Sequence, residues 1–158
     1  MQRLCAPTNT VQVQRGEPEQ EAIGRSKGGL STKIHATTDA LGNPLGFHLT
    51  PGQACDLDGA DQLLTDLVAD TVLADKAYDA DERVIERLEA QGKTAVIPPK
   101  RNRTSPREYD KHLYKARHLI ENFFAKLKQY RAIATRYDKR AVNFLGAIYL
   151  TASVIWLN

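Results

Sequence analysis

The alternation of apolar and polar side chains is clearest near the start of the chain, where it predicts a β-hairpin. Residues 32–50 alternate polar and apolar positions on either side of a turn-like segment. We expect His35 and His48 to be exposed strand positions rather than metal ligands. Asp39 is expected to serve the turn, because aspartate is favoured there by hydrogen bonds to the backbone.

Downstream, the spacing of apolar residues predicts helices alternating with strands. The expected elements are a helix at 56–69, a strand at 71–78, a helix at 81–91, a strand at 94–97, a helix at 114–130 and a final helix at 141–157. Asp56 or Asp58 and Asp79 or Asp81 are expected to cap the first two helices. Residues 1–23 are mostly polar and aperiodic, and read as an arm. This order predicts an α/β domain with a mixed sheet flanked by helices.

The predicted helix at 114–130 separates its polar and apolar residues into adjacent stripes. At about 100° per residue, one narrow polar stripe contains Tyr114, Arg117, Glu121 and Lys128. The neighbouring apolar stripe contains Leu113, Ala116, Ile120, Phe124 and Leu127. A carboxylate is therefore expected at the edge of a buried face, among two cations and a phenol. A plain amphipathic surface helix with charge pairs is the alternative interpretation.

The termini and the cysteines favour a cytoplasmic protein. Residues 141–157 are strongly apolar, but they are short for a membrane span and include four polar side chains, so we expect a buried helix. The first residues lack the apolar core of a signal peptide. Cys5 and Cys55 have neither metal-binding nor redox spacing, which indicates reduced thiols.

Positive charge is concentrated in one part of the chain and predicts a polyanionic partner. Residues 100–140 contain 13 Lys or Arg and four acids, a net +9, whereas residues 1–99 carry −6. Such asymmetry favours nucleic acid, although a solvated helical surface would also be basic. The glycine-rich segment 24–33 is not a Walker loop, because Leu30 stands where that motif needs lysine. It reads as a basic loop able to touch a DNA backbone, or as a plain turn.

Two carboxylates indicate a divalent-metal site. Asp75 ends the apolar part of the expected strand at 71–78, where the chain emerges from the core, and Glu121 lies on the striped helix. Mg²⁺ takes few carboxylates together with phosphate oxygens. Two such ions could clamp the attacking and leaving oxygens of a phosphodiester.

The helix spacing Y-x2-R-x3-E-x6-K resembles the signature of bacterial insertion-sequence transposases of the DDE type, in the IS-four and IS-five groups. Tyr114, Arg117, Glu121 and Lys128 carry it. Further matches to the family, in order, lie at 24–29 with 32–35, 49–52, 73–78, 97–99 and 135–139. The resemblance therefore runs from about Gly24 to the end of the chain.

The resemblance implies a ribonuclease-H-like core that nicks transposon ends with Mg²⁺ or Mn²⁺ and then joins the freed 3′-hydroxyl to target DNA. Asp75 and Glu121 would be the second and third acidic residues of the triad, and metal ligands. DNA contacts are implied for Tyr114, Arg117, Lys128 and Lys76. The family also implies a dimer in the active complex, acting in the cytoplasm at the nucleoid.

The chain departs from the family at the first acidic residue, which should lie on a central strand upstream of the glycine-rich segment. Before Asp39 the carboxylates are Glu17, Glu19 and Glu21, in a loop-like stretch. The first strand is therefore expected to be missing or degenerate, with 1–23 as an arm or remnant and 24–158 as a partial catalytic domain. We expect residues 8–14 to occupy the vacant position in the sheet, since unpaired strand edges are unfavourable.

Three functions remain open from the sequence. The chain could be a transposase catalytic part, inactive alone and dependent on an upstream-frame segment. It could be a catalytically dead remnant that binds DNA or regulates the intact enzyme. A structural α/β protein without a DNA role conflicts with the +9 segment. A decayed copy, a mis-assigned start and a frameshifted element are all compatible origins.

Overall fold

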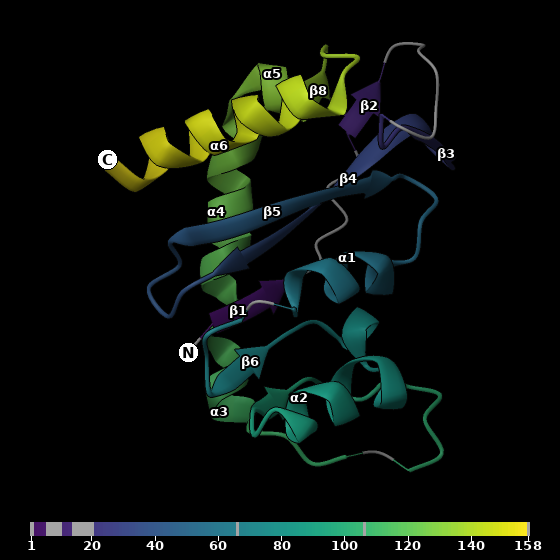
Figure 1. Cartoon of the computed structure of the whole chain (residues 1–158), viewed down its shortest axis with the longest axis vertical. Helices are drawn as coiled ribbons and strands as arrows, with labels where there is room; N and C mark the ends of the chain where they lie inside the picture. Colours follow the sequence, from purple (N-terminus) through teal and green to yellow (C-terminus); the bar gives the residue numbers. More distant parts are fainter. Residues whose placement is uncertain (1, 6–10, 14–20, 66, 106, 158) are drawn as a thin grey trace.

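One mixed β-sheet crosses the molecule, with helices on both of its faces (Figure 1). The computed structural model describes the chain except for residues 1, 6–10, 14–20, 66, 106 and 158, and gives only the backbone at 2–5 and 11–13. The predicted α/β class with a mixed sheet is confirmed.

The described residues form a single eight-stranded sheet. Its strands are β1 (Gln2–Cys5), β2 (Val11–Val13), β3 (Gly24–Ser26), β4 (Gly29–Thr38), β5 (Pro44–Pro51), β6 (Thr71–Leu73), β7 (Thr94–Val96) and β8 (Thr135–Arg136). The long path is β7-β6-β1-β4-β2-β8, and β3 and β5 also pair with β4. β1 is antiparallel to β4 but parallel to β6, which is parallel to β7.

The first strand of the sheet is formed by residues that the sequence did not indicate. β1 lies between β4 and β6, with Arg3 opposite both Thr38 and Leu73. Residues 11–13 also join the sheet as β2, but between β4 and β8. The prediction that residues 8–14 fill the central position was therefore wrong for 11–13, and residues 8–10 and 14 lie outside the described residues.

The predicted hairpin is confirmed as β4 and β5, paired from Thr32↔Pro51 to Thr38↔Pro44. Asp39 makes the turn as expected, since its Oδ1 accepts from the backbone of Leu41 at 2.8 Å and of Asn43 at 2.9 Å. Slight burial acts to raise the pKa of Asp39, but these hydrogen bonds outweigh it and hold the pKa below its ordinary value.

The helices are shorter and more interrupted than the periodicity predicted. They are α1 (Asp56–Leu63), the 3₁₀ turn η1 (Lys76–Tyr78), the π-helical turn η2 (Asp81–Ile85), α2 (Glu86–Ala90), α3 (Lys111–Lys115), α4 (His118–Gln129), α5 (Arg131–Ala134) and α6 (Ala141–Leu157). The expected strand at 71–78 stops at Leu73, because the chain turns into η1 directly after Asp75. Cys55 is the N-cap of α1, and its backbone N–H donates to the Asp58 carboxylate at 3.1 Å.

The striped helix is not continuous. Between α3 and α4 the backbone N–H groups of Ala116 and Arg117 bond to carbonyls three residues back, at 3.0 and 2.9 Å. Such a 3₁₀ turn advances about 120° per residue instead of 100°, so positions before it lose their phase with those after it. Leu113, placed in the apolar stripe by the regular helix, is accordingly 38% exposed, whereas Ile120 is fully buried.

Helices pack on both faces of the sheet and form two hydrophobic cores. The prediction that His35 is exposed is therefore wrong. Ile34 and Ala36 of β4 pack on the side of α4 and α6. His35 points to the other face, where it is buried under α1 rather than exposed. Gly59 of α1 allows this contact, because a Cβ there would lie 2.3 Å from the His35 ring. His48 is half-buried.

The final helix is only partly buried, which corrects the expectation of a buried helix at 141–157. α6 turns Phe144, Ile148 and Ala152 into the core with α4. Its opposite side leaves large apolar side chains exposed. Among the described residues, no helix combines the length and apolar character needed to cross a bilayer.

Candidate metal and nucleic-acid site

Asp75 emerges at the carboxyl end of β6, next to the carboxyl end of the parallel strand β1. It is the N-cap of η1, and its Oδ1 accepts from the backbone N–H of Ala77 at 3.1 Å. This turn holds the side chain at the surface, 26% exposed, rather than in the core. Asp75 therefore lies where the strand leaves the core, as expected, but it is positioned by a backbone turn that the sequence did not indicate.

Arg117 brings the two candidate carboxylates together. It stands at the start of α4, and its Nη1 lies 3.4 Å from Asp75 Oδ2. Its Nη2 donates to Glu121 Oε1, one turn further along α4. One guanidinium thus bridges a strand end and a helix that are 46 positions apart in the sequence. The site is open, since Glu121 is about half exposed.

The other residues predicted to contact DNA lie at different distances from this bridge. The Arg117 Cζ lies 5.5 Å from the centre of the Tyr114 ring, and Tyr109 meets the same ring edge-on at 5.5 Å. Lys76 is exposed directly after Asp75. Lys128 is exposed on α4, seven residues or about 10 Å beyond Glu121.

The described residues contain no group of three or more His, Cys, Asp or Glu able to hold a metal ion. Asp75 and Glu121 nevertheless share one cation, which shows that both carboxylates face a common point. Mg²⁺ is often held by one or two carboxylates with phosphate oxygens and water completing the shell. The pair therefore fits a partial divalent-metal site.

Part of the basic segment is neutralised inside the protein, which the sequence did not indicate. Arg103 and Arg107 each bind both Asp79 and Asp81, with contacts of 2.6–3.1 Å. The Asp79 side chain is 1% exposed and also accepts from the backbone N–H of Lys100 at 2.7 Å. Asp79 is thus a buried anchor for the loop rather than a helix cap, and those two arginines are not simply a DNA-facing charge.

A further cation of the basic segment is buried at the opposite end of the sheet. Arg136 is fully buried, donates to Thr32 Oγ1 at 2.6 Å and stacks over the Phe144 ring at 4.8 Å. Burial lowers its pKa, although nearby Glu21 and Asp138 act to raise it. Glu21 also accepts from the first backbone N–H of α6, at Ala141. Residues 135–139, one of the matches to the family, therefore contain a structural clamp between β8, β4 and α6.

His35 connects the turn that presents Asp75 to the centre of the sheet. Its Nδ1 lies 3.3 Å from Tyr78 Oη, and its Nε2 lies 2.8 Å from Thr50 Oγ1. Tyr78 belongs to η1, and its backbone N–H donates to the Asp75 carbonyl at 2.9 Å. Burial lowers the His35 pKa to about 4, so the ring is neutral near pH 7. The alternation of polar and apolar residues predicted on which face of β4 His35 lies. It did not predict that α1 covers that face.

The glycine-rich segment does not join this site. It forms the hairpin of β3 and β4 instead of a loop, with Arg25 and Lys27 exposed near its tip. Figure 1 places β3 far from β6, at the other end of β4. Lys33 points inward to Asp56, with an Nζ–Oδ1 distance of 2.8 Å. The expected contact of this segment with DNA therefore needs a surface separate from the one around Asp75.

A strand-end carboxylate, a helical carboxylate and an arginine shared between them are groups able to hold a divalent cation and a phosphate. The comparisons with known proteins identify the family of the chain. Residues 9–156 match the family described as "Transposase DDE domain". The chain belongs to this family, as its motifs predicted.

A relative in Brucella ovis (strain ATCC 25840 / 63/290 / NCTC 10512) shows the same membership. It is described as "Putative transposase for insertion sequence element IS6501". It is 42% identical over 132 residues, which are 81% of this chain and 99% of the relative. No solved structure matches the chain.

Proposed function

We propose that this chain is the catalytic domain of a DNA transposase with Asp75 and Glu121 as metal ligands. The observation that carries the proposal is the Arg117 bridge, which places both carboxylates around one positive charge. A ribonuclease-H-like core is part of the proposal. It is supported by the order β5-β4-β1-β6-β7, in which the first three strands are antiparallel and the last three parallel.

In this proposal Asp75 and Glu121 supply oxygen ligands to Mg²⁺ or Mn²⁺. When bound, such an ion supplies Lewis-acid chemistry that stabilises the charge of a phosphodiester under attack. Arg117 exchanges its carboxylate contacts for a DNA phosphate, which its planar fork can bind with two hydrogen bonds. Lys128 and Lys76 bind the DNA backbone on either side, and Tyr114 packs against a nucleotide beside the cut.

We further propose that the described carboxylates are too few for efficient cleavage by this chain alone. The strand β1 reads Gln2-Arg3-Leu4-Cys5 and ends beside Asp75 without an acidic residue. A ligand at that strand end would complete a triad with Asp75 and Glu121. Transposon ends and target DNA are the proposed partners, with an upstream-frame segment and a second copy in the active complex, in the cytoplasm at the nucleoid.

A DNA-binding protein without cleavage activity, which regulates the intact transposase, is the second candidate. The missing acidic residue on β1 favours it, while the exposed lysines near the bridge would still bind phosphates. Both candidates bind DNA through the same surface, but only the first one cleaves it.

Two measurements test these proposals. Mn²⁺ binding, followed by electron paramagnetic resonance or calorimetry, should be lost in both Asp75→Asn and Glu121→Gln. Glu89→Gln is the matched control, since Glu89 is an exposed carboxylate on a different element, α2. Unchanged Mn²⁺ binding in the two variants would refute the metal site.

Nicking of duplex DNA that contains the element's ends, with and without Mg²⁺, separates the two candidates. DNA binding without nicking supports the regulator. Nicking that Glu121→Gln leaves intact would show that the catalytic residues lie elsewhere.

A further inference from the structure

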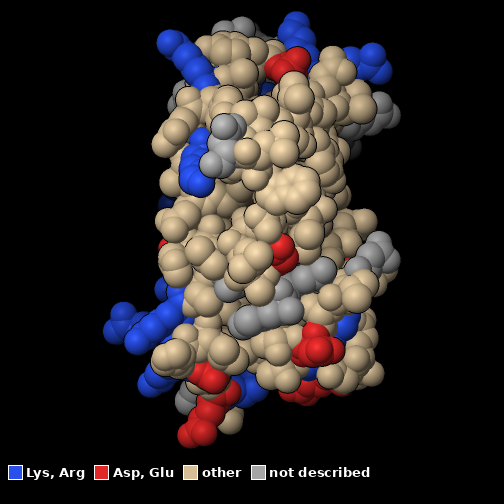
Figure 2. Space-filling view, turned by 90° about the vertical axis from the view of Figure 1, so that its left-hand side faces the viewer, with Lys and Arg blue, Asp and Glu red and all other residues tan. Residues whose placement is uncertain are grey.

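The outer side of α6 is an uncharged apolar surface. The helix contains no Asp, Glu, Lys or Arg over its 17 residues. Its exposed large apolar side chains are Val142, Tyr149, Leu150, Val154, Trp156 and Leu157, of which Leu150 is 70% and Leu157 80% exposed. Figure 2 shows the face at the C-terminal end of α6, where a broad area carries few charged groups. Contiguous exposed apolar surface of this kind marks an interaction site.

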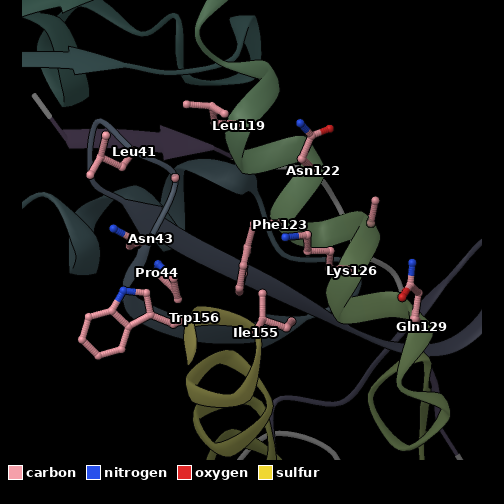
Figure 3. A pocket seen from close by; sticks show the side chains of 12 residues that line it. Leu41, Asn43, Pro44, Leu119, Asn122, Phe123, Lys126, Gln129, Ile155 and Trp156 are labelled. Atoms are coloured by element: carbon pink, nitrogen blue, oxygen red, sulfur yellow. The ribbon is translucent and has the colours of Figure 1, made fainter. Parts of the chain in front are cut away.

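A groove extends this surface toward the β4–β5 turn. It has a volume of about 540 Å³ and lies between that turn, α4 and the end of α6. Phe123 and Ile155 line it from the two helices, and Trp156 stands near Pro44 at its side (Figure 3). Leu41, at the turn, is 79% exposed beside it. The apolar surface therefore continues beyond one helix.

Gly146 leaves the surface of α6 open to a close approach by another helix. Glycine inside a helix destabilises it relative to alanine. A Cβ on Gly146 would meet nothing within 4 Å, so packing inside the described part of the chain does not require glycine. A helix from outside could come close at this point, because no side chain stands in the way.

We propose that a second copy of this chain covers this surface, with the two α6 helices packed antiparallel about a two-fold axis. When the apolar surface of α6 faces the same surface of the second copy, the two-fold axis falls between Tyr149 and Leu150. Gly146 then lies opposite Ser153 of the second copy, and Val142 lies opposite its Leu157. Ser153 suits this position, because its hydroxyl already donates to the Tyr149 carbonyl of its own helix at 2.9 Å.

Charge and area both favour a second copy as the occupant. A helix without charges meets an identical helix without repulsion, whereas a surface helix that binds lipid usually adds Lys or Arg on its polar side. The exposed parts of the apolar side chains on α6 and of Leu41 amount to on the order of 800 Å², the area that each partner contributes to a standard interface. This inference rests on the part of the proposed function that places a second copy in the active complex, and it gives that copy a docking surface. It depends on neither metal nor DNA, so its failure would leave the proposed metal site untouched.

Sedimentation equilibrium over a concentration series tests the interface on the full chain. Leu150→Glu should weaken dimerisation at least about 100-fold, because it buries a charge near the axis. Val68→Glu is the matched control, since Val68 is 88% exposed in the connection after α1, a helix that covers the opposite face of the sheet from α6. The control should dimerise like the parent chain.

Gly146→Leu separates the interface from the stability of the monomer. Leucine has the higher helix propensity and meets open space here, so thermal unfolding of the monomer should be unchanged or shifted upward. Dimerisation should nevertheless be lost, because the added side chain keeps the helices apart. A parent chain that stays monomeric throughout the series, or a dimer that tolerates both α6 substitutions, would overturn the proposal.

Discussion

The Arg117 guanidinium lies 3.4 Å from the Asp75 carboxylate while it also donates to Glu121. Arginine cannot lose its charge at ordinary pH, so it neutralises part of the negative potential that two nearby carboxylates create. A divalent cation and this arginine would therefore compete for the same oxygens.

Arg117→Gln should raise the affinity for Mn²⁺ roughly fivefold. Removal of one positive charge from partly exposed carboxylates is worth about 1 kcal/mol. Isothermal titration calorimetry measures the change, with the exposed Arg101→Gln as control. Weaker Mn²⁺ binding in Arg117→Gln would mean that the arginine organises the pair rather than competing with the ion.

The ion pairs that Asp79 and Asp81 make with two arginines predict that the two aspartates contribute very differently to the free energy of unfolding. Asp79→Asn should lower the free energy of unfolding by about 3 kcal/mol, because it leaves Arg103 and Arg107 without their buried partner. Asp81→Asn touches the same two arginines, but Asp81 is 52% exposed, so its cost should stay below about 1 kcal/mol. Urea denaturation of both variants checks the contrast, and equal losses would contradict it.

His35 predicts a pH-dependent stability. Its pKa of about 4 in the folded protein is below the ordinary 6.5, so between these values the unfolded chain binds more protons. Stability is therefore fully present above about pH 6.5 and is lost as the pH falls through 4, by about 3 kcal/mol in total. His48, whose pKa burial also lowers, adds a change of the same sign.

His35→Gln should flatten this profile while it leaves the contribution of His48. The measurement is the urea midpoint between pH 4 and pH 8 for the parent and the variant. If both chains lost the same stability over this range, the buried His35 could not be its source.

Lys128 predicts a sequence-independent contribution to DNA binding. Lys128→Ala should weaken binding to any duplex several-fold and reduce the slope of log K against log salt by about 1, the effect of one phosphate contact. Fluorescence anisotropy at several salt concentrations gives both quantities. Lys139→Ala is the control, since Lys139 is exposed near β8, far from Asp75. An equal loss in the control would indicate a general charge effect.

Local patterns in the sequence predicted the elements that depend on neighbouring residues. The β4–β5 hairpin and the Asp39 turn are short-range features, and the alternation of residues 32–50 was sufficient for them. The same alternation was wrong for His35, because α1 covers the face that is solvated in a sheet with helices on one side only. The family motif likewise selected Asp75 and Glu121, but the 3₁₀ turn that orients Arg117 between them has no signal in the periodicity.

Long-range contacts could not be predicted from the sequence, for a different reason. Nothing in residues 2–5 indicates pairing with Leu73, and nothing in 135–139 indicates a buried arginine bonded to Thr32. Asp79 and Arg107 show opposite charge in the sequence, but charge alone gives no distance. Such pairings depend on the complete topology, so only coordinates reveal them.

The contacts between the two ends of the chain have a consequence for how the protein is made. β2 pairs with β8, and Thr32 with Arg136, across more than a hundred residues. On a ribosome the β4–β5 hairpin can form early, whereas these contacts must wait until the last quarter of the chain has emerged. Folding rates fall as native contacts become less local. The unfinished edge of the sheet is therefore exposed throughout synthesis, when a nascent chain is most open to aggregation and to chaperones.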